Sequence, residues 1–235
     1  MVAPVVVALG GSLLHPDEDE RHIWLQEICS VVENHVQSGD HIGLVIGGGA
    51  PARDAISLAK PLIEDVNALD EVGIAATRLN ATVVAQAMMA AGLDVCPDIP
   101  SDTISAAHSL SQHQIVVMGG TSPGHTTDNV AIRLSIEVKA NICIIATNID
   151  KVYDKDPRAF EDARSIDSMT LSELQQIVGP PIHGKAGGSG VIDPIGVQAA
   201  LDHNLPLAVL DGRETGRLAS ALSGMPFEGT SIRVG

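Results

Sequence analysis

The chain has 235 residues, a length that suits one large α/β domain or two small ones. Hydrophobic residues make up 45% of it and aromatic residues only 2%, so the core must be aliphatic and base stacking on aromatic platforms is nearly excluded. The formal net charge of −15 also argues against a nucleic-acid backbone as partner.

Apolar runs that predict strands alternate with helical patterns along the whole chain, without repeats or a clear linker. This alternation predicts a single domain, 1–235, of the α/β class, a three-layer sandwich around a mainly parallel sheet. The first expected elements are a strand at 2–9, a helix ending near 36, a strand at 41–46, a helix with Pro51 in its first turn and a helix at 68–91. They are followed by a short strand at 95–99, a helix at 101–110 capped by Ser101 or Asp102, a strand at 114–118, a helix at 129–140, a strand at 141–146 and a polar hairpin reaching Pro157. The last part is expected to form helices at 170–178 and 194–204, a strand at 205–210, a helix at 213–222 and an edge strand at 229–234.

Three glycine clusters follow predicted strands and precede predicted helices. They are Gly10-Gly11, Gly47-Gly48-Gly49 and Gly119-Gly120. One such cluster is usually a tight turn, but three indicate an anion site, because free backbone N–H groups and helix dipoles both favour negative charge. The chain has neither the P-loop pattern nor the dinucleotide-binding glycine pattern in its usual context.

The stretch from 118 to 157 carries two polar loops on consecutive strands. Residues 119–128 form a small, hydroxyl-rich glycine loop ahead of a helix, and residues 147–157 follow the next strand. Both loops therefore reach the carboxyl edge of a parallel sheet, which is where open α/β sheets bind ligands.

Phosphoryl transfer to a phosphate acceptor needs positioning and charge neutralisation rather than a general base. Arg53 and Lys185, both near glycine-rich loops, are candidates for the neutralising cations. Asp128 could orient Lys185 or the water shell of a magnesium ion, or could instead cap the helix expected at Asn129. His125 is expected to contact a ligand or order its loop rather than act as an acid or base.

Cysteine usage and the N-terminus bear on location. Cys29, Cys96 and Cys143 are far apart and show no disulfide framework or metal-ligand spacing, which fits a reducing compartment. No signal-like segment or run of membrane-spanning length is visible, so the expected location is cytoplasmic.

Several motifs together resemble the amino acid kinase superfamily, and within it the archaeal-type uridylate (UMP) kinases. The most specific are GGTSPGHTTD, beginning at Gly119, and TNIDKVYDKDP, beginning at Thr147. They are accompanied, in order along the chain, by VVALGGSLL, VIGGGAPAR, LDEVGIAATRLNA and KAGGSGVIDP.

This resemblance implies a fold, a reaction and a set of site residues. The reaction is magnesium-dependent transfer of a phosphoryl group from ATP to UMP, with the part up to about 140 serving mainly the acceptor and oligomer contacts, and 141–235 serving mainly ATP. The expected catalytic residues are Lys185, Arg53 and Asp128. The expected ATP contacts are Gly11, Ser12, Gly49, Arg53, Thr147, Asn148, Tyr153 and Asp156. The expected UMP contacts are Gly48, Asp70, Thr121, Ser122, Pro123, Gly124, His125, Thr126 and Thr127.

The resemblance also implies a homo-oligomer, a hexamer built from dimers. Two positions depart from the family pattern, since Lys151 stands at a usual glycine and Ser122 at a frequent histidine. Two alternatives stay open. One is another phosphate-acceptor kinase of this fold, such as an isopentenyl phosphate kinase, and the other is a non-catalytic storage or binding oligomer like the molybdenum storage proteins.

Overall fold

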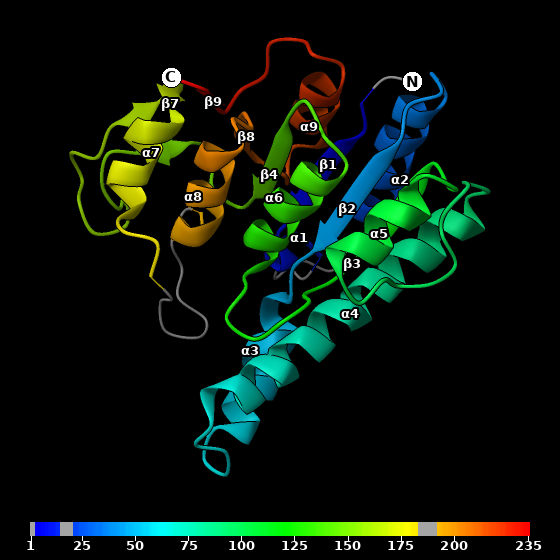
Figure 1. Cartoon of the computed structure of the whole chain (residues 1–235), viewed down its shortest axis with the longest axis horizontal. Helices are drawn as coiled ribbons and strands as arrows, with labels where there is room; N and C mark the ends of the chain where they lie inside the picture. The colour runs from blue at the N-terminus through cyan, green and yellow to red at the C-terminus, as the bar shows by residue number, and fades with distance from the viewer. Residues whose placement is uncertain (1–2, 15–20, 183–191) are drawn as a thin grey trace.

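A sheet of seven strands forms the centre of the computed structural model, which describes residues 3–14, 21–182 and 192–235 (Figure 1). The strands of this sheet are β1 (Val5–Leu9), β2 (Ile42–Ile46), β3 (Ile115–Met118), β4 (Cys143–Thr147), β7 (Ser168–Thr170), β8 (Leu207–Asp211) and β9 (Thr230–Arg233). Their order is β3-β2-β1-β4-β8-β9-β7, and neighbours are parallel except for β8 with β9. β5 (Val152–Tyr153) and β6 (Ser165–Ile166) form a small antiparallel pair. The predicted, mainly parallel α/β sheet is confirmed.

Helices cover both faces of the sheet, which gives three layers (Figure 1). The helices are α1 (Gly11–Leu14), α2 (Arg21–Val36), α3 (Gly49–Ala59), α4 (Val66–Ala90), α5 (Thr103–Leu110), α6 (Thr127–Glu137), α7 (Leu171–Val178), α8 (Pro194–Asp202) and α9 (Thr215–Leu222). Because alternate strand residues point to opposite faces, Val6 and Ala8 of β1 join the core under α5, α6, α7 and α8, while Val7 and Leu9 join the core under α2, α4 and α9. Both cores are aliphatic, as the composition requires.

Side-chain caps fix where several helices begin. The Asp65 carboxylate accepts a hydrogen bond from the Asn67 N–H at 3.0 Å and starts α4. Asp102, one of the two predicted candidates, caps α5. At α7, Thr170 and Glu173 form the predicted capping box, in which each side chain bonds the backbone N–H of the other. These polar residues place helix starts where the sequence predicted them, within a few residues.

Two predicted strands differ from the structure. Residues 95–99 do not form a strand, since Val95 makes only an isolated bridge to Ile115, and Pro97 and Pro100 cannot donate to a ladder. The last strand, β9, is not an edge strand, because β7 pairs with its outer side. β7 has three residues, too few to show an alternating pattern in the sequence.

α3 and the first half of α4 extend beyond the sheet as a helical hairpin (Figure 1). Large apolar side chains are exposed along this hairpin, among them Leu58, Leu62 and Val66. Leu62, at the turn, is 88% exposed. Among the described residues, no helix combines the length and apolarity needed to cross a bilayer.

Candidate active site

The first two glycine clusters lie in direct backbone contact at the carboxyl edge of β1 and β2. A Cβ added to Gly11 would lie 2.1 Å from the Gly49 nitrogen and 2.6 Å from the Gly47 carbonyl oxygen. A Cβ on Gly49, where φ is +60°, would lie 2.3 Å from the Gly11 oxygen. Only glycine fits these positions, so the two helices α1 and α3 begin beside one another with little side-chain bulk between them. Such a cradle suits a phosphate group.

Helix α4 holds the second and third glycine clusters through two buried polar side chains. The Asn80 amide donates to the carbonyl oxygens of Gly47 and Gly48 at 2.8 and 3.0 Å. The Thr77 hydroxyl accepts from the Gly120 N–H at 2.7 Å and donates to the Ile74 carbonyl. The anchoring roles of Thr77 and Asn80 were not predicted from the sequence. The signal was present, because two polar residues three apart interrupt an apolar helix face.

The loop at residues 121–127 is held by Asp70 of α4. The Asp70 carboxylate accepts a hydrogen bond from the Gly124 N–H at 2.7 Å, and Gly124 has φ of +79°. The loop also turns on itself, since the His125 N–H donates to the Ser122 carbonyl at 3.2 Å. The structure therefore brings Asp70 together with this loop, which are both among the expected UMP contacts.

Helix α6 begins at Thr127, two residues before the predicted start, and Thr126 is its cap. The Thr126 hydroxyl accepts from the Asn129 N–H at 3.3 Å. The proposed capping role of Asp128 is therefore wrong, because Asp128 already lies inside the first turn. Burial, together with the neighbouring charge of Asp193, raises the pKa of Asp128 to about 7. Such a carboxyl group, at the carboxyl edge of the sheet where the glycine clusters also lie, is a candidate functional group.

The second polar loop follows β4 on the other side of β1. The Gly10 N–H donates to the Ala146 carbonyl at 2.9 Å, so the start of the first glycine cluster lies against the end of β4 and Thr147. Tyr153 and Asp156 make local contacts instead. The Tyr153 hydroxyl donates to Asp150 at 3.0 Å, and Asp156 accepts from the Arg158 N–H at 2.9 Å. Thr147 therefore lies directly against the glycine cradle, whereas Tyr153 and Asp156 belong to the segment that follows it.

The candidate cations differ in how far the structure describes them. Arg53 is exposed on α3, one turn after Gly49, on the same side of the helix. Lys185 lies outside the described residues. Lys151, which replaces the usual glycine, forms an ion pair with Asp167 and so ties the hairpin after β4 to the segment before β7.

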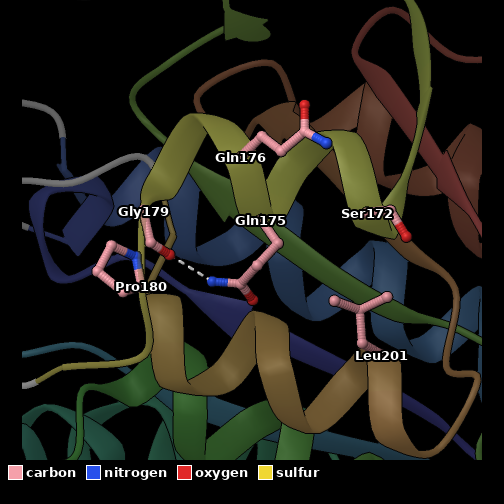
Figure 2. Close-up of a pocket in the computed structure, with 6 residues that line it drawn as sticks. All are labelled: Ser172, Gln175, Gln176, Gly179, Pro180 and Leu201. Atoms are coloured by element: carbon pink, nitrogen blue, oxygen red, sulfur yellow. Dashed lines mark hydrogen bonds between the residues drawn. The ribbon is translucent and has the colours of Figure 1, made fainter.

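A surface depression of about 430 Å³ lies elsewhere, between α7 and α8 (Figure 2). Its lining residues are Ser172, Gln175, Gln176, Gly179, Pro180 and Leu201. The Gln175 amide donates to the Gly179 carbonyl across it (Figure 2). The lining carries no charged side chain, so this depression does not suit a phosphorylated ligand, and the glycine cradle remains the better candidate.

Comparisons with known proteins agree with this arrangement. Residues 3–211 match the model of the Amino acid kinase family. The chain is 37% identical to a uridylate kinase of Methanococcus maripaludis (strain C6), over 97% of this chain and 98% of the relative. It is 35% identical to a uridylate kinase of Haloquadratum walsbyi, over 97% and 92%.

A solved structure is similar as well. The crystal structure of uridylate kinase from Archaeoglobus fulgidus superimposes with a TM-score of 0.84 at 32% identity, covering 97% of this chain and 99% of that one. The fold, the contacting glycine clusters and these full-length similarities agree with one another. The chain belongs to the amino acid kinase family.

Proposed function

We propose that the protein is a UMP kinase that reversibly transfers the γ-phosphoryl group of ATP to UMP, giving ADP and UDP (EC 2.7.4.22), in pyrimidine nucleotide biosynthesis. The observation that carries this proposal is the contact between Gly11 and Gly49, with the loop at 121–127 held beside it by Asp70. Full-length relatives named as uridylate kinases support the choice of acceptor.

The two sides of the cradle serve different substrates in this proposal. Gly48, Asp70 and the loop at 121–127 bind UMP, whereas Gly11, Ser12, Gly49 and Arg53 bind the ATP phosphates. Thr147, Asn148, Tyr153 and Asp156 line the pocket for the ATP nucleoside. The supporting observation is that β1 lies between β2 and β4, which places the cradle between the two polar loops. The N-terminal part up to about 140 thus serves mainly the acceptor, and the rest mainly ATP.

The chain's residues would promote the reaction by orientation and charge neutralisation. Backbone N–H groups of the glycine clusters and the start of α6 would hold the phosphates in line. Arg53 and Lys185 would neutralise charge on the transferring group, and the ionised form of Asp128 would orient Lys185. No general base is needed, because the acceptor phosphate already carries negative charge near neutral pH.

The residues present fit ATP and Mg²⁺. Helices α1 and α3 begin where the first two glycine clusters meet, so backbone N–H groups at these helix starts could contact phosphate oxygens. Within the described part of the chain no group of three or more His, Cys, Asp or Glu could hold a metal. Mg²⁺ at kinase sites is held largely by phosphate oxygens and water, so Asp128 would suffice as the acceptor for its water shell. The ion would supply neutralisation of phosphate charge.

We also propose a cytoplasmic homo-oligomer, with a hexamer built from dimers as the expected form. The exposed Leu58, Leu62 and Val66 on the α3–α4 hairpin support association, because exposed apolar surface of this kind commonly marks an interface.

The alternatives are less well supported. An isopentenyl phosphate kinase is expected to carry a histidine after its glycine cluster, whereas Ala50, Pro51 and Ala52 follow here. A storage oligomer for oxyanions would need basic residues gathered on a cage interior, and the chain is strongly acidic overall.

A coupled assay tests the proposed function. Purified protein with magnesium-ATP is offered UMP, CMP, dUMP, isopentenyl phosphate or acetylglutamate, and ADP release is followed. UMP is expected to be the preferred acceptor. Absence of ADP release with UMP, or faster release with isopentenyl phosphate, contradicts the assignment.

Replacing Asp70 with asparagine is expected to raise the KM for UMP at least about 10-fold and leave the KM for ATP within about 2-fold. The carboxylate holds the loop at 121–127 through the Gly124 N–H. Asparagine can still accept this hydrogen bond but lacks the charge, and hydrogen bonds to charged groups contribute roughly 1.5–3 kcal/mol against about 1 kcal/mol for neutral ones. Initial-rate kinetics with each substrate varied in turn measure both constants. A larger rise in the KM for ATP would mean that the two pockets are assigned the wrong way round.

A further inference from the structure

Asp193 connects helices α6 and α8, which pack against each other. Its Oδ1 accepts from the Ile195 N–H at 2.8 Å and from the Gly196 N–H at 3.4 Å, which caps α8. Its Oδ2 accepts from the Thr126 hydroxyl at 2.9 Å. Asp193 is only 9% exposed. One buried carboxylate therefore caps its own helix and holds the cap of α6.

These contacts use the Thr126 hydroxyl both as a donor and as an acceptor. It has a single proton, which goes to Asp193, and it accepts from the Asn129 N–H. The hydroxyl proton is therefore not available to a ligand, so the proposed contact of Thr126 with UMP would be made by its backbone. The position of the hydroxyl fixes the first turn of α6. That turn holds Thr127 and Asp128, which lie at the proposed point of transfer.

The two helices also approach closely at this end. A Cβ added to Gly196 would lie 3.2 Å from the Asn129 Cα and 3.0 Å from the Ile132 Cδ1. Asn129 is completely buried against α8. A shift of α8 would therefore move the start of α6, and the hydrogen bond between Asp193 and Thr126 sets their relative position.

The choice of a charged residue here carries an electrostatic cost. Asp193 raises the proton affinity of Asp128, its neighbour in the site, and it adds negative charge beside a phosphate cradle. An apolar contact between the helices would avoid this cost. A carboxylate, however, is the smallest side chain that can accept hydrogen bonds on both of its oxygens. Asparagine keeps one acceptor and replaces the other with a donor.

We propose that Asp193 is a positioning residue for phosphoryl transfer, which acts by holding the Thr126 hydroxyl and thereby the first turn of α6 in place. This proposal rests on the proposed UMP kinase function, and it assigns to Asp193 no contact with either substrate. Its effect falls on turnover rather than on substrate binding, because a displaced group near the reacting atoms slows the chemical step.

The test combines kinetics with amide hydrogen exchange on the full chain. Asp193→Asn is expected to lower kcat about 10- to 100-fold while both KM values change less than about 3-fold. Exchange in the first turn of α6, at Thr127–Ala131 of the chain, is expected to become at least about 10-fold faster. Thr126→Val should reproduce both effects, and Thr126→Ser, which keeps the hydroxyl, should lose far less turnover than Thr126→Val. The double variant should be no worse than the poorer single variant.

Two controls match the substitution. Asp202→Asn removes the same charge from the last turn of α8, where Asp202 accepts a hydrogen bond from Gln198, and Asp102→Asn alters the cap of α5. Neither should change kcat or exchange in α6. Unchanged kcat in Asp193→Asn, additive losses in the double variant, or losses confined to the KM values would overturn the proposal. If Asp193→Asn does not fold, the valine and serine variants at 126 decide. If the unmodified protein does not phosphorylate UMP, the proposed function fails. Amide hydrogen exchange in α6 still tests separately whether the hydrogen bond between Asp193 and Thr126 holds this turn in place.

Discussion

Asp128→Asn is expected to lower turnover about 100-fold or more and, at pH 8, to raise the melting temperature by about 4–8 °C. The loss of turnover follows because an amide cannot supply the negative charge that orients a lysine or the magnesium water shell. The gain in stability follows because the folded protein holds this carboxylate in an unfavourable environment. The temperature range corresponds to roughly 2 kcal/mol for a chain of this size.

The sign of the stability effect follows from the raised pKa of Asp128. Burial first, and the charge of Asp193 second, raise this pKa from 3.8 to about 7. Between these values the folded state binds more protons than the unfolded state, so stability falls as the pH rises, and the full penalty is present above pH 7. The penalty is at most about 4 kcal/mol. Asparagine should therefore stabilise the protein at pH 8 and have little effect near pH 4.

The pH dependence of activity should also report the ionisation of Asp128. In the unmodified protein, kcat/KM is expected to fall as the pH drops below about 7, since the ionised carboxylate is the active form and kcat/KM reports on the free enzyme. The variant should lack this decrease. Asp98→Asn, an exposed site with the same change of charge, serves as the control. An unchanged melting temperature at pH 8, or a lower one, would contradict the assignment of a half-buried, unfavourable charge.

Gly11→Ala is expected to abolish measurable ATP-dependent turnover, a loss of at least about 1,000-fold, and to lower the melting temperature by several degrees. The added methyl group would lie 2.1 Å from the Gly49 nitrogen and 2.6 Å from the Gly47 carbonyl carbon and oxygen. All three are backbone atoms, so the two glycine clusters must separate. Overpacking of this kind costs about 1–3 kcal/mol, and the separation also destroys the phosphate cradle.

The chain contains a matched control for this substitution. Gly216, in the first turn of α9, has open space where a Cβ would stand. Gly216→Ala should keep full activity and leave stability unchanged or raised by up to about 1 kcal/mol, since alanine favours the helix. Thermal unfolding and steady-state kinetics on both variants provide the comparison. Retention of turnover in Gly11→Ala would mean that the contact between the clusters is dispensable.

The sequence by itself determined the class of fold and the general location of the site. Continuous apolar runs followed by glycines identified β1, β2 and β3, because a parallel strand is buried on both faces and its ligands gather at its carboxyl end. The capping box at Thr170 and the first-turn Pro51 also placed helix starts correctly. These are local signals, which depend on residues close together in the chain.

Only the tertiary structure decided which distant residues support the site. The bonds from Thr77 to Gly120, from Asn80 to Gly47 and from Asp193 to Thr126 join residues 33 to 67 positions apart. The sequence marks Thr77 and Asn80 as polar residues on an apolar helix face, but it does not say which distant residues they contact. The same holds for Asp128, where the sequence left a cap and a charged role open. In the structure Thr126 caps the helix, since the helix starts at Thr127. Burial and the nearby charge of Asp193 raise the pKa of Asp128. Packing of α6 against α8, rather than helix propensity, decides both outcomes.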